Sequence, residues 1–278
     1  MIVLSAQTRG NLDAHVSAIS DGGYTVITSV LNSTELSRAK SVLLDLFARE
    51  KRMGSRENWD GPAYQISLCL PAKHRVFRDL CAIPQALELA GHLLGDDCVV
   101  GSMNGFTTKP HGQIQPMHLD FPGERSLMTS LLFIICLDDF TVENGCTRVV
   151  PGSQRRFGSL KSFDHLESET VKIEASAGSL IVCDGDIVHG AGANQTSDFR
   201  LALHLVYSRS WVKPQWDIAL SMRQGVRDRL TDSERKLFGL DAHSYVLDGY
   251  TGRPIEYWRR GRFKYYLRRL RSRIRTGL

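Results

Sequence analysis

Residues 199–208 read FRLALHLVYS, a stretch in which large apolar side chains alternate with a second, more varied set. Alternate side chains of an extended strand lie on the same face, so the three leucines share one face while Arg200 and His204 share the other. Further short apolar runs precede this stretch, separated by clusters of Gly, Asn, Asp and Pro: CVV (98–100), SLMTSLLFIICL (126–137), TRVV (147–150), TVKIEA (170–175) and SLIVC (179–183). Short strands divided by turns favour a β-sandwich or barrel over βαβ units.

Two helices are predicted ahead of these strands. The motif NSTE at 32–35 is a polar cap with an acid three positions on, and the apolar residues that follow share one helical face, which predicts a helix over 33–50. A second helix is predicted to begin after Pro84 and to end at the turn at Gly95. The polar segment 51–75 between them is expected to be irregular.

These elements predict a single, mainly β domain with flanking helices. Its parts would be an N-terminal helical layer over 1–96, a β core over 97–212 and a helical extension over 213–278. The end of the extension is basic: residues 253–278 hold ten Lys or Arg and one acid, whereas the whole chain has a formal charge of +5. The rest of the chain is therefore mildly acidic, which argues against nucleic-acid binding as its main function. Apolar residues interleaved with these cations favour packing on the body or on a second subunit, with partner docking as the alternative.

The composition indicates an ordinary globular protein. With 42% hydrophobic and 23% charged residues, a chain of 278 residues can bury a sizeable core and is not expected to be disordered. The first residues lack the pattern of a signal peptide, and no run of about 18 apolar residues occurs, so neither export nor a membrane span is expected. Six cysteines stand singly without a CxxC pair, which is typical of reduced thiols and predicts a cytoplasmic location.

Three residues form a candidate metal site. His118 and Asp120 stand two apart in QPMHLD, so an extended backbone would aim both side chains at one point, and His189 ends the segment that follows SLIVC. Two histidines and one carboxylate on one side of a metal are the ligand set of non-haem Fe(II) oxygenases, with positions left open. The plainer interpretation is a surface turn, because an isolated HxD is common. Asp184 or Asp186 could also supply the carboxylate, although DGD is typical of a turn.

Arg200 strengthens the metal hypothesis. It lies 11 positions after His189 and opens a largely apolar strand, where a charge needs an anionic partner. A planar guanidinium binds a carboxylate through two parallel hydrogen bonds, so the far carboxylate of a metal-chelating keto-acid would suit it.

Four motifs in order carry a resemblance to a known family. They are Q-x-x-H-x-D at 115–120, ENGCTRVVPGSQ at 143–154, HG with a later Asn at 189–194, and Arg200. This set resembles the phytanoyl-CoA dioxygenase family of Fe(II)/2-oxoglutarate oxygenases over roughly 100–212. The resemblance implies a double-stranded β-helix, a jelly roll whose open end holds the metal.

The resemblance also implies roles for six residues. Iron would be bound by His118, Asp120 and His189. Arg200 would pair with the distal carboxylate of 2-oxoglutarate, while Gln115 and Thr147 would hydrogen-bond the cosubstrate near the metal. Thr147 could equally be an ordinary strand residue.

The implied reaction couples oxidative decarboxylation of 2-oxoglutarate by O2, giving succinate and CO2, to oxidation of a small organic molecule, with hydroxylation as the default and secondary metabolism as the context. Halogenating relatives have a small residue where Asp120 stands, so halogenation is not expected. The substrate itself stays open. Two alternatives also stay open: a non-catalytic ligand-binding jelly roll with a vestigial metal site, and an oxygenase directed at macromolecules, which only the basic end supports.

Other polar and aromatic residues near these motifs are predicted to be structural. His204 is expected to be a hydrogen-bonded core histidine, with a place in the cosubstrate pocket as the alternative. Lys109 and His111 are expected in a polar loop. Trp211 and Trp216 would either shape the substrate entrance or pack against the C-terminal helices. Core packing is likewise favoured over a place in the pocket for Met103 and Phe121.

Overall fold

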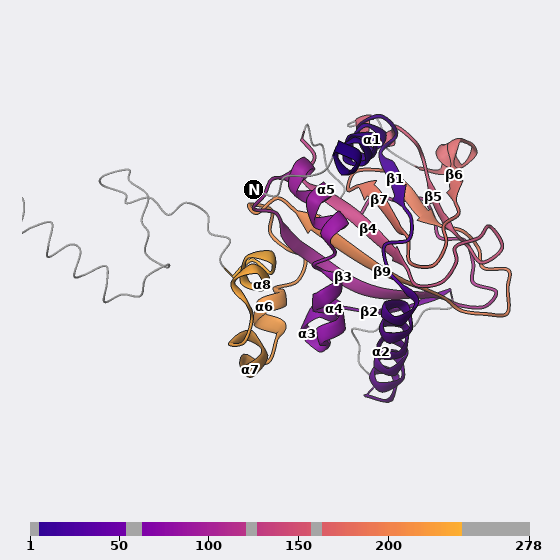
Figure 1. Ribbon diagram of the computed structural model, residues 1–278. Helices are drawn as coiled ribbons and strands as arrows, with labels where there is room; N and C mark the ends of the chain where they lie inside the picture. Colours follow the sequence, from indigo (N-terminus) through magenta and orange to yellow (C-terminus); the bar gives the residue numbers. More distant parts are fainter. Residues whose placement is uncertain (1–5, 54–62, 121–126, 157–162, 241–278) are drawn as a thin grey trace, which may run out of the picture. The chain divides into compact units, whose positions relative to one another are not determined.

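The computed structural model describes residues 6–53, 63–120, 127–156 and 163–240 (Figure 1). Its helices are α1 Ala6–Gly22, α2 Ser33–Met53, α3 Leu70–Lys73, α4 Arg75–Leu80, α5 Pro84–Leu94, α6 Ile218–Ser221, α7 Gln224–Arg227 and α8 Asp232–Leu237. Its strands are β1 Tyr24–Ile27, β2 Tyr64–Ser67, β3 Val99–Thr108, β4 Ser130–Cys136, β5 Thr147–Val149, β6 Val171–Ile173, β7 Leu180–Asp184, β8 His189–Ala191 and β9 Arg200–Ser208.

The strands form two antiparallel sheets. The major sheet has the order β1-β7-β4-β9-β3-β2, and the minor sheet has the order β6-β5-β8. A segment ending at His118 extends the minor sheet, because His118 pairs with His189 at the start of β8. Apolar side chains from both sheets meet in one cluster that includes Ile134, Ile181 and Val149. The two sheets therefore pack face to face and enclose a core between them.

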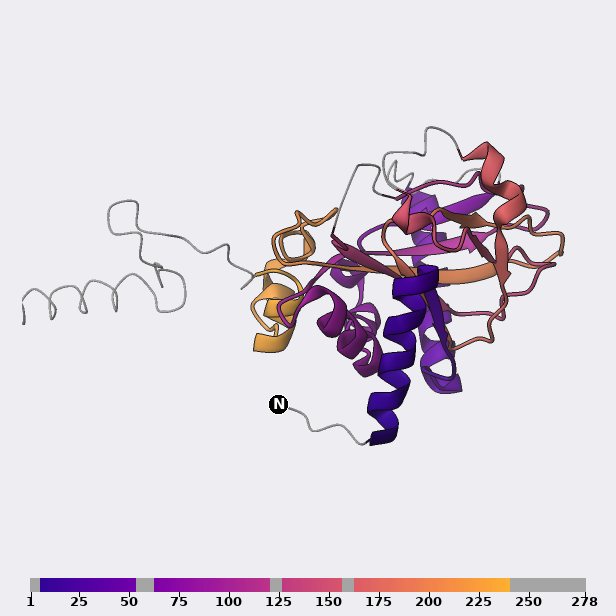
Figure 2. The ribbon, with the colours of Figure 1, turned by 90° about the horizontal axis from the view of Figure 1, so that it is seen from above.

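Helices cover the other face of the major sheet. Figure 2 shows α1 to α5 on one side of this sheet and the minor sheet on the other. The apolar cluster on the helical side joins Leu43 of α2 and Phe77 of α4 to Leu203 of β9. The contact is close at Gly105 of β3, where an added Cβ would lie 2.4 Å from Cδ1 of Leu43. A side chain at this position would require the Leu43 side chain to move.

The predicted alternation of β9 is confirmed. Its leucines and Tyr207 belong to the cluster under the helices, whereas Ala202 and Val206 belong to the cluster between the sheets. Strand β4 divides in the same way, with Phe133 toward the helices and Ile134 toward the minor sheet. Because a one-residue slip would exchange these faces, burial on both sides sets the register.

The two predicted helices are confirmed, and the first is capped as expected. Oδ1 of Asn32 accepts hydrogen bonds from the backbone N–H of Thr34 and Glu35, each at 3.0 Å. In return, Oε2 of Glu35 accepts from the backbone N–H of Asn32 at 2.9 Å. Helix α5 begins at Pro84 and has Gly95 as its C-cap.

For the described residues of 51–75 the prediction of an irregular segment is wrong, and the segment 1–96 also contains strands. Helix α2 runs to Met53, β2 and α3 follow, and β1 and β2 form the two edges of the major sheet. Both edge strands have four residues that are mostly only partly buried. Such short strands carry too little apolar alternation to be recognised from sequence.

Three further predictions concern the C-terminal extension, the cysteines and membrane-spanning helices. The start of the C-terminal extension is helical at α6 to α8, whereas the basic stretch 253–278 lies outside the described residues. All six cysteines are free, and four of them are buried. Within the described ranges, no helix combines the length and the apolar character needed to cross a membrane.

Candidate active site

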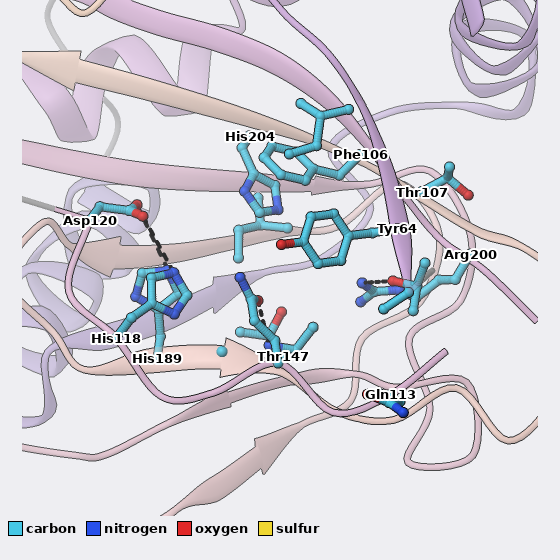
Figure 3. Close-up of a pocket in the computed structure, with 17 residues that line it drawn as sticks. Tyr64, Phe106, Thr107, Gln113, His118, Asp120, Thr147, His189, Arg200 and His204 are labelled. Atoms are coloured by element: carbon cyan, nitrogen blue, oxygen red, sulfur yellow. Dashed lines mark hydrogen bonds and ion pairs between the residues drawn. The ribbon is translucent and has the colours of Figure 1, made fainter. Parts of the chain in front are cut away.

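The minor sheet brings the three candidate metal ligands together. The backbone N–H of His118 donates to the carbonyl of His189 at 2.9 Å, and the N–H of His189 donates back at 3.0 Å. Directly opposed residues of an antiparallel pair project from the same face, so the two imidazoles lie with ring centroids 4.6 Å apart. Asp120, two residues after His118, reaches the same point (Figure 3). Its carboxylate oxygens lie 3.6 Å from Nε2 of His118 and 3.8 Å from Nε2 of His189.

Backbone carbonyls set which nitrogen of each imidazole faces Asp120. Nδ1 of His118 lies 3.0 Å from the carbonyl oxygen of Pro116, and Nδ1 of His189 lies 3.1 Å from that of Ile187. A carbonyl can only accept, so Nδ1 carries the proton in both rings. The lone pairs of both Nε2 atoms are left for a metal, and the potential ligand atoms of the triad all lie within 4.8 Å of one another.

Asp120 carries a negative charge at neutral pH. Burial alone would raise the pKa of Asp120, but the neighbouring His118 and His189 hold it well below its usual range. Burial lowers the pKa of His189 despite the attraction of Asp120. For His118, burial acts in the same direction, but the interactions with Asp120 outweigh it and raise the pKa. An ionised carboxylate beside imidazoles is a donor set suited to a divalent transition metal.

Arg200 occupies the opposite end of the same space. It is 5% exposed, and its Nη2 donates to Oγ1 of Thr108, its cross-strand neighbour, at 2.7 Å. Its guanidinium carbon lies 3.9 Å from the ring centroid of Phe140. Burial lowers the pKa of Arg200 to about 10, so it remains a cation at neutral pH.

Two nitrogens of Arg200, Nε and Nη1, have no hydrogen-bond partner in the described part of the chain. Burying a cation without a counter-ion lowers the stability of the folded state by roughly several kcal/mol, unless a ligand supplies the counter-ion. The guanidinium is thus oriented by Thr108 and left with donors for a carboxylate.

A cavity of about 180 Å³ connects the metal triad with Arg200. Figure 3 shows His118, His189 and Asp120 at one end and Arg200 at the other, with Thr147 between them. Gln115 also lines the cavity; its Oε1 accepts from the backbone N–H of Ala191 at 3.0 Å, which leaves its amide NH2 as the remaining donor group. All six residues predicted for the site therefore border one cavity.

Arg148 ties together the two segments that carry the histidines. Its Nη2 donates to the carbonyl of Gln115 at 2.7 Å and to that of Ala191 at 3.4 Å, and its Nη1 pairs with Glu167. Gly190 stands opposite Arg148 in the sheet, and a Cβ there would lie 3.1 Å from the carbonyl oxygen of Gln115. Arg148 stands in the motif ENGCTRVVPGSQ, but the sequence alone suggested no role for it.

The cavity has further lining residues that the sequence did not reveal. Tyr64 and Gln113 line it near the edge strand β2, and Phe106 comes from the middle of β3. His204 was expected to be a hydrogen-bonded core residue, and this expectation is wrong: it lines the cavity and stacks on Phe106 with ring centroids 4.0 Å apart. The strand alternation that places His204 on the same face as Arg200 was the available signal.

The other candidates do not line this cavity. Asp184 is buried and accepts the backbone N–H of Asp186 at 3.0 Å, as a DGD turn requires. Met103 is buried in the cluster under the helices. Trp211 is 64% exposed, whereas Nε1 of Trp216 donates to Oδ1 of Asn104 at 3.1 Å.

The loop interpretation holds for the residues ahead of the site, since His111 is an exposed turn residue with a φ of 55°. Phe121 lies outside the described residues.

Comparison with known proteins decides the family. The sequence profile of the phytanoyl-CoA dioxygenase (PhyH) family matches residues 19–202. The chain belongs to the phytanoyl-CoA dioxygenase family. A curated relative, dioxygenase af480 of Aspergillus fumigatus, is 27% identical over 248 residues, which cover 86% of this chain and 80% of the relative. The family and this relative are named as dioxygenases, so the prediction of a dioxygenase is confirmed at this coarser level.

Solved structures confirm the predicted jelly roll. The α-ketoglutarate-dependent carbocyclase SnoK from nogalamycin biosynthesis aligns with a TM-score of 0.62 and 24% identity over 82% of this chain and 91% of SnoK. HygX from Streptomyces hygroscopicus, in a structure with nickel, 2-oxoglutarate and hygromycin B, aligns with a TM-score of 0.61 and 15% identity over 76% of this chain and 90% of HygX. At these identities the likeness concerns the fold.

Proposed function

We propose that this chain is an Fe(II)- and 2-oxoglutarate-dependent dioxygenase that uses O2 to hydroxylate, or otherwise oxidise, a small organic metabolite. His118, Asp120 and His189 would bind the iron, and Arg200 would bind the distal carboxylate of 2-oxoglutarate. Gln115 and Thr147 would hydrogen-bond the cosubstrate between these two points. When bound, iron with the keto-acid would supply the oxidising chemistry that couples decarboxylation to substrate oxidation.

The donor set supports iron as the metal. Two imidazole nitrogens and one carboxylate lie within 4.8 Å of one another, a donor set that suits Fe(II) and would leave positions for a cosubstrate. Asp120 provides the carboxylate that a halogenating enzyme would lack, so hydroxylation is the expected outcome.

The single observation that carries the proposal is the buried Arg200. Arg200 has a threonine hydroxyl on one side and, on the other, two donors without a partner among the described residues. Such a cation needs an anion, and the cavity leads from it to the metal triad. A dicarboxylate keto-acid would suit both ends at once: one end would bind the metal held by the triad, and the other would neutralise the guanidinium of Arg200. Arg200, which is 5% exposed, would thereby orient the cosubstrate and keep its charged end away from solvent.

The relatives support a small-molecule substrate in secondary metabolism. SnoK comes from nogalamycin biosynthesis, and the HygX structure contains hygromycin B. The free, mostly buried cysteines suit the reducing cytoplasm, which stays a prediction.

Anaerobic titration with Fe(II) and 2-oxoglutarate tests the proposal. We expect the weak visible charge-transfer band of an iron-chelated keto-acid in the wild-type protein and no band in His189→Ala. His165→Ala removes an exposed histidine outside the site and is the matched control, in which the band should persist.

Two results would contradict the proposal. No band in the wild type would favour a ligand-binding module with a vestigial metal site. A band of equal strength in His189→Ala would show that the metal is held elsewhere.

A further inference from the structure

The faces of β3 and β9 that are turned toward the minor sheet, here called the inner face, line the cavity between the metal triad and Arg200, here called the cosubstrate cavity. The inner face continues beyond this cavity to a second polar group. On β9, Arg200 and His204 are four residues apart on one face, or about 13 Å along the strand. On β3 their cross-strand partners are Thr108 and Asn104. The ring of Phe106 lies between the two groups and stacks on His204. One sheet face therefore carries two separate polar ends with an aromatic divider.

A second cavity of about 120 Å³ opens at the Asn104 and His204 end. It shares Phe106, Asp120 and His204 with the cosubstrate cavity. The Asp120 carboxylate thus borders both spaces, one shared with Arg200 and one facing away from it. A molecule in the second cavity, here called the Asn104 cavity, would lie beside the metal without displacing the cosubstrate.

The orientation of the Asn104 amide is determined by its contacts. Asn104 is 7% exposed, and its Oδ1 accepts from the backbone N–H of Cys69 at 3.0 Å and from Nε1 of Trp216 at 3.1 Å. Both of these groups are donors, so the oxygen and not the NH2 must face them. The NH2 has no hydrogen-bond partner within the described ranges, and Asn104 lines the cavity, so the amide presents a donor to any occupant.

Apart from Asp120, the other described residues of the lining are neutral. Ser102 and Gln215 add hydrogen-bonding groups, and the backbone N–H of Gln215 is anchored to the carbonyl of Gly101 at 2.9 Å. The ring nitrogens of His204 make no hydrogen bond to a described residue, and Figure 3 shows this ring beside Asp120 and Phe106. Asp120 is the one charged side chain among the described residues of this lining.

We propose that the Asn104 cavity binds the part of the substrate that is oxidised, and that this part is uncharged and carries a hydroxyl, ether or carbonyl oxygen that accepts a hydrogen bond from Asn104. The inference rests on the proposed function, because it takes Asp120 as a metal ligand. An anionic group would meet the Asp120 carboxylate, and the two positive charges of the bound metal would already be exceeded by this carboxylate and the dianionic cosubstrate. An ammonium group would meet the NH2 of Asn104, a donor facing a donor.

The test uses four probes that share a six-membered ring: cyclohexanone, cyclohexanol, cyclohexanecarboxylate and cyclohexylammonium. Their binding to the full chain loaded with Zn(II) and 2-oxoglutarate is measured by saturation-transfer NMR, since Zn(II) is diamagnetic. The two neutral probes should bind at least about fivefold more tightly than the charged ones, the value of one net hydrogen bond.

The variant Asn104→Asp sharpens the test because it keeps the oxygen that Cys69 and Trp216 require and replaces only the NH2 donor. Cyclohexanone binding should fall by about fivefold, and cyclohexylammonium binding should rise. Asn11→Asp, an exposed position on α1, makes the same charge change away from the cavity and should alter neither value.

Two outcomes overturn the inference: charge-independent binding of the four probes to the wild type, or an Asn104→Asp variant with the wild-type preference. The visible band with Fe(II) and 2-oxoglutarate separates this failure from failure of the proposed function. If the band forms but the probes are not discriminated, only the assignment of the Asn104 cavity fails. If no band forms in the wild type, the metal and cosubstrate assignment fails first.

Discussion

The two faces of strand β9 carry side chains of opposite kinds. Toward the helices, Leu203, Leu205 and Tyr207 are fully buried in one apolar cluster. Toward the minor sheet, Arg200 keeps two nitrogens without a partner among the described residues, and His204 borders two cavities. The face toward the helices, called the packed face below, consists of buried apolar side chains in contact with one another. The other face carries buried polar groups that lack partners among the described residues. Polar groups that are buried but not satisfied are typical of ligand sites.

The largest effect is expected from breaking the packed face. Leu203→Ala removes a fully buried side chain and leaves a cavity, so the free energy of unfolding should fall by about 2–5 kcal/mol. Denaturant unfolding measures this loss. The protein that remains folded should bind 2-oxoglutarate with unchanged affinity, and weaker binding would mean that the two faces are not independent.

On the other face, Arg200→Met should separate stability from binding. The affinity for 2-oxoglutarate should fall by about 30- to 1,000-fold, because charge-assisted hydrogen bonds to the distal carboxylate are lost. The cosubstrate-free protein should become more stable by about 1–3 kcal/mol, since a buried and incompletely paired cation is removed. Titration of the visible band and thermal unfolding measure the two effects. A variant that is destabilised and binds normally would assign Arg200 a structural role.

Asp184 tests whether a charge on the packed face is costly. Alternation in β7 places it on the same face as Leu180 and Val182, and burial raises its pKa to about 6. The folded state therefore holds this proton more tightly than the unfolded state, and stability falls as the pH rises from about 4 through 6. Asp184→Asn keeps an oxygen for the N–H of Asp186 and should add about 1–3 kcal/mol above pH 6, with little gain below pH 4. A gain that does not depend on pH would contradict the raised pKa.

The smallest effect is expected at Arg148, which acts on the site only through the backbone. Arg148→Met releases the carbonyls of Gln115 and Ala191 and should weaken Co(II) binding by about tenfold, because the two histidine segments lose their common support. The visible absorption of bound Co(II) measures this affinity. Arg148→Lys retains a charge for Glu167 but not the paired contacts, so it should recover stability rather than metal affinity. Full recovery of metal affinity by lysine would contradict the positioning role.

Features that depend on residues close together in the sequence could be predicted, whereas features that depend on distant segments could not. His118 and Asp120 are two residues apart and Arg200 opens a regular alternation, so local geometry singled them out as candidates, and the resemblance to the family then implied their roles. Strand β3 was recognised only at its start, because Ser102, Asn104 and Gly105 resemble turn residues. Those residues are polar or small because they line a cavity or meet α2, and both causes lie outside the strand itself.

The sequence by itself determined the elements that local chemistry controls: the capped helix at Ser33, the two-faced strand β9, and a ligand set whose spacing resembles that of one family. The tertiary structure alone decided that His118 pairs with His189, 71 positions later, and that Arg200 is buried with two nitrogens that no described residue pairs. It also decided that the inner face has two polar ends. The reason is physical: burial and partner choice depend on which strands become neighbours, and that is set by packing between sheets and helices rather than by any one segment.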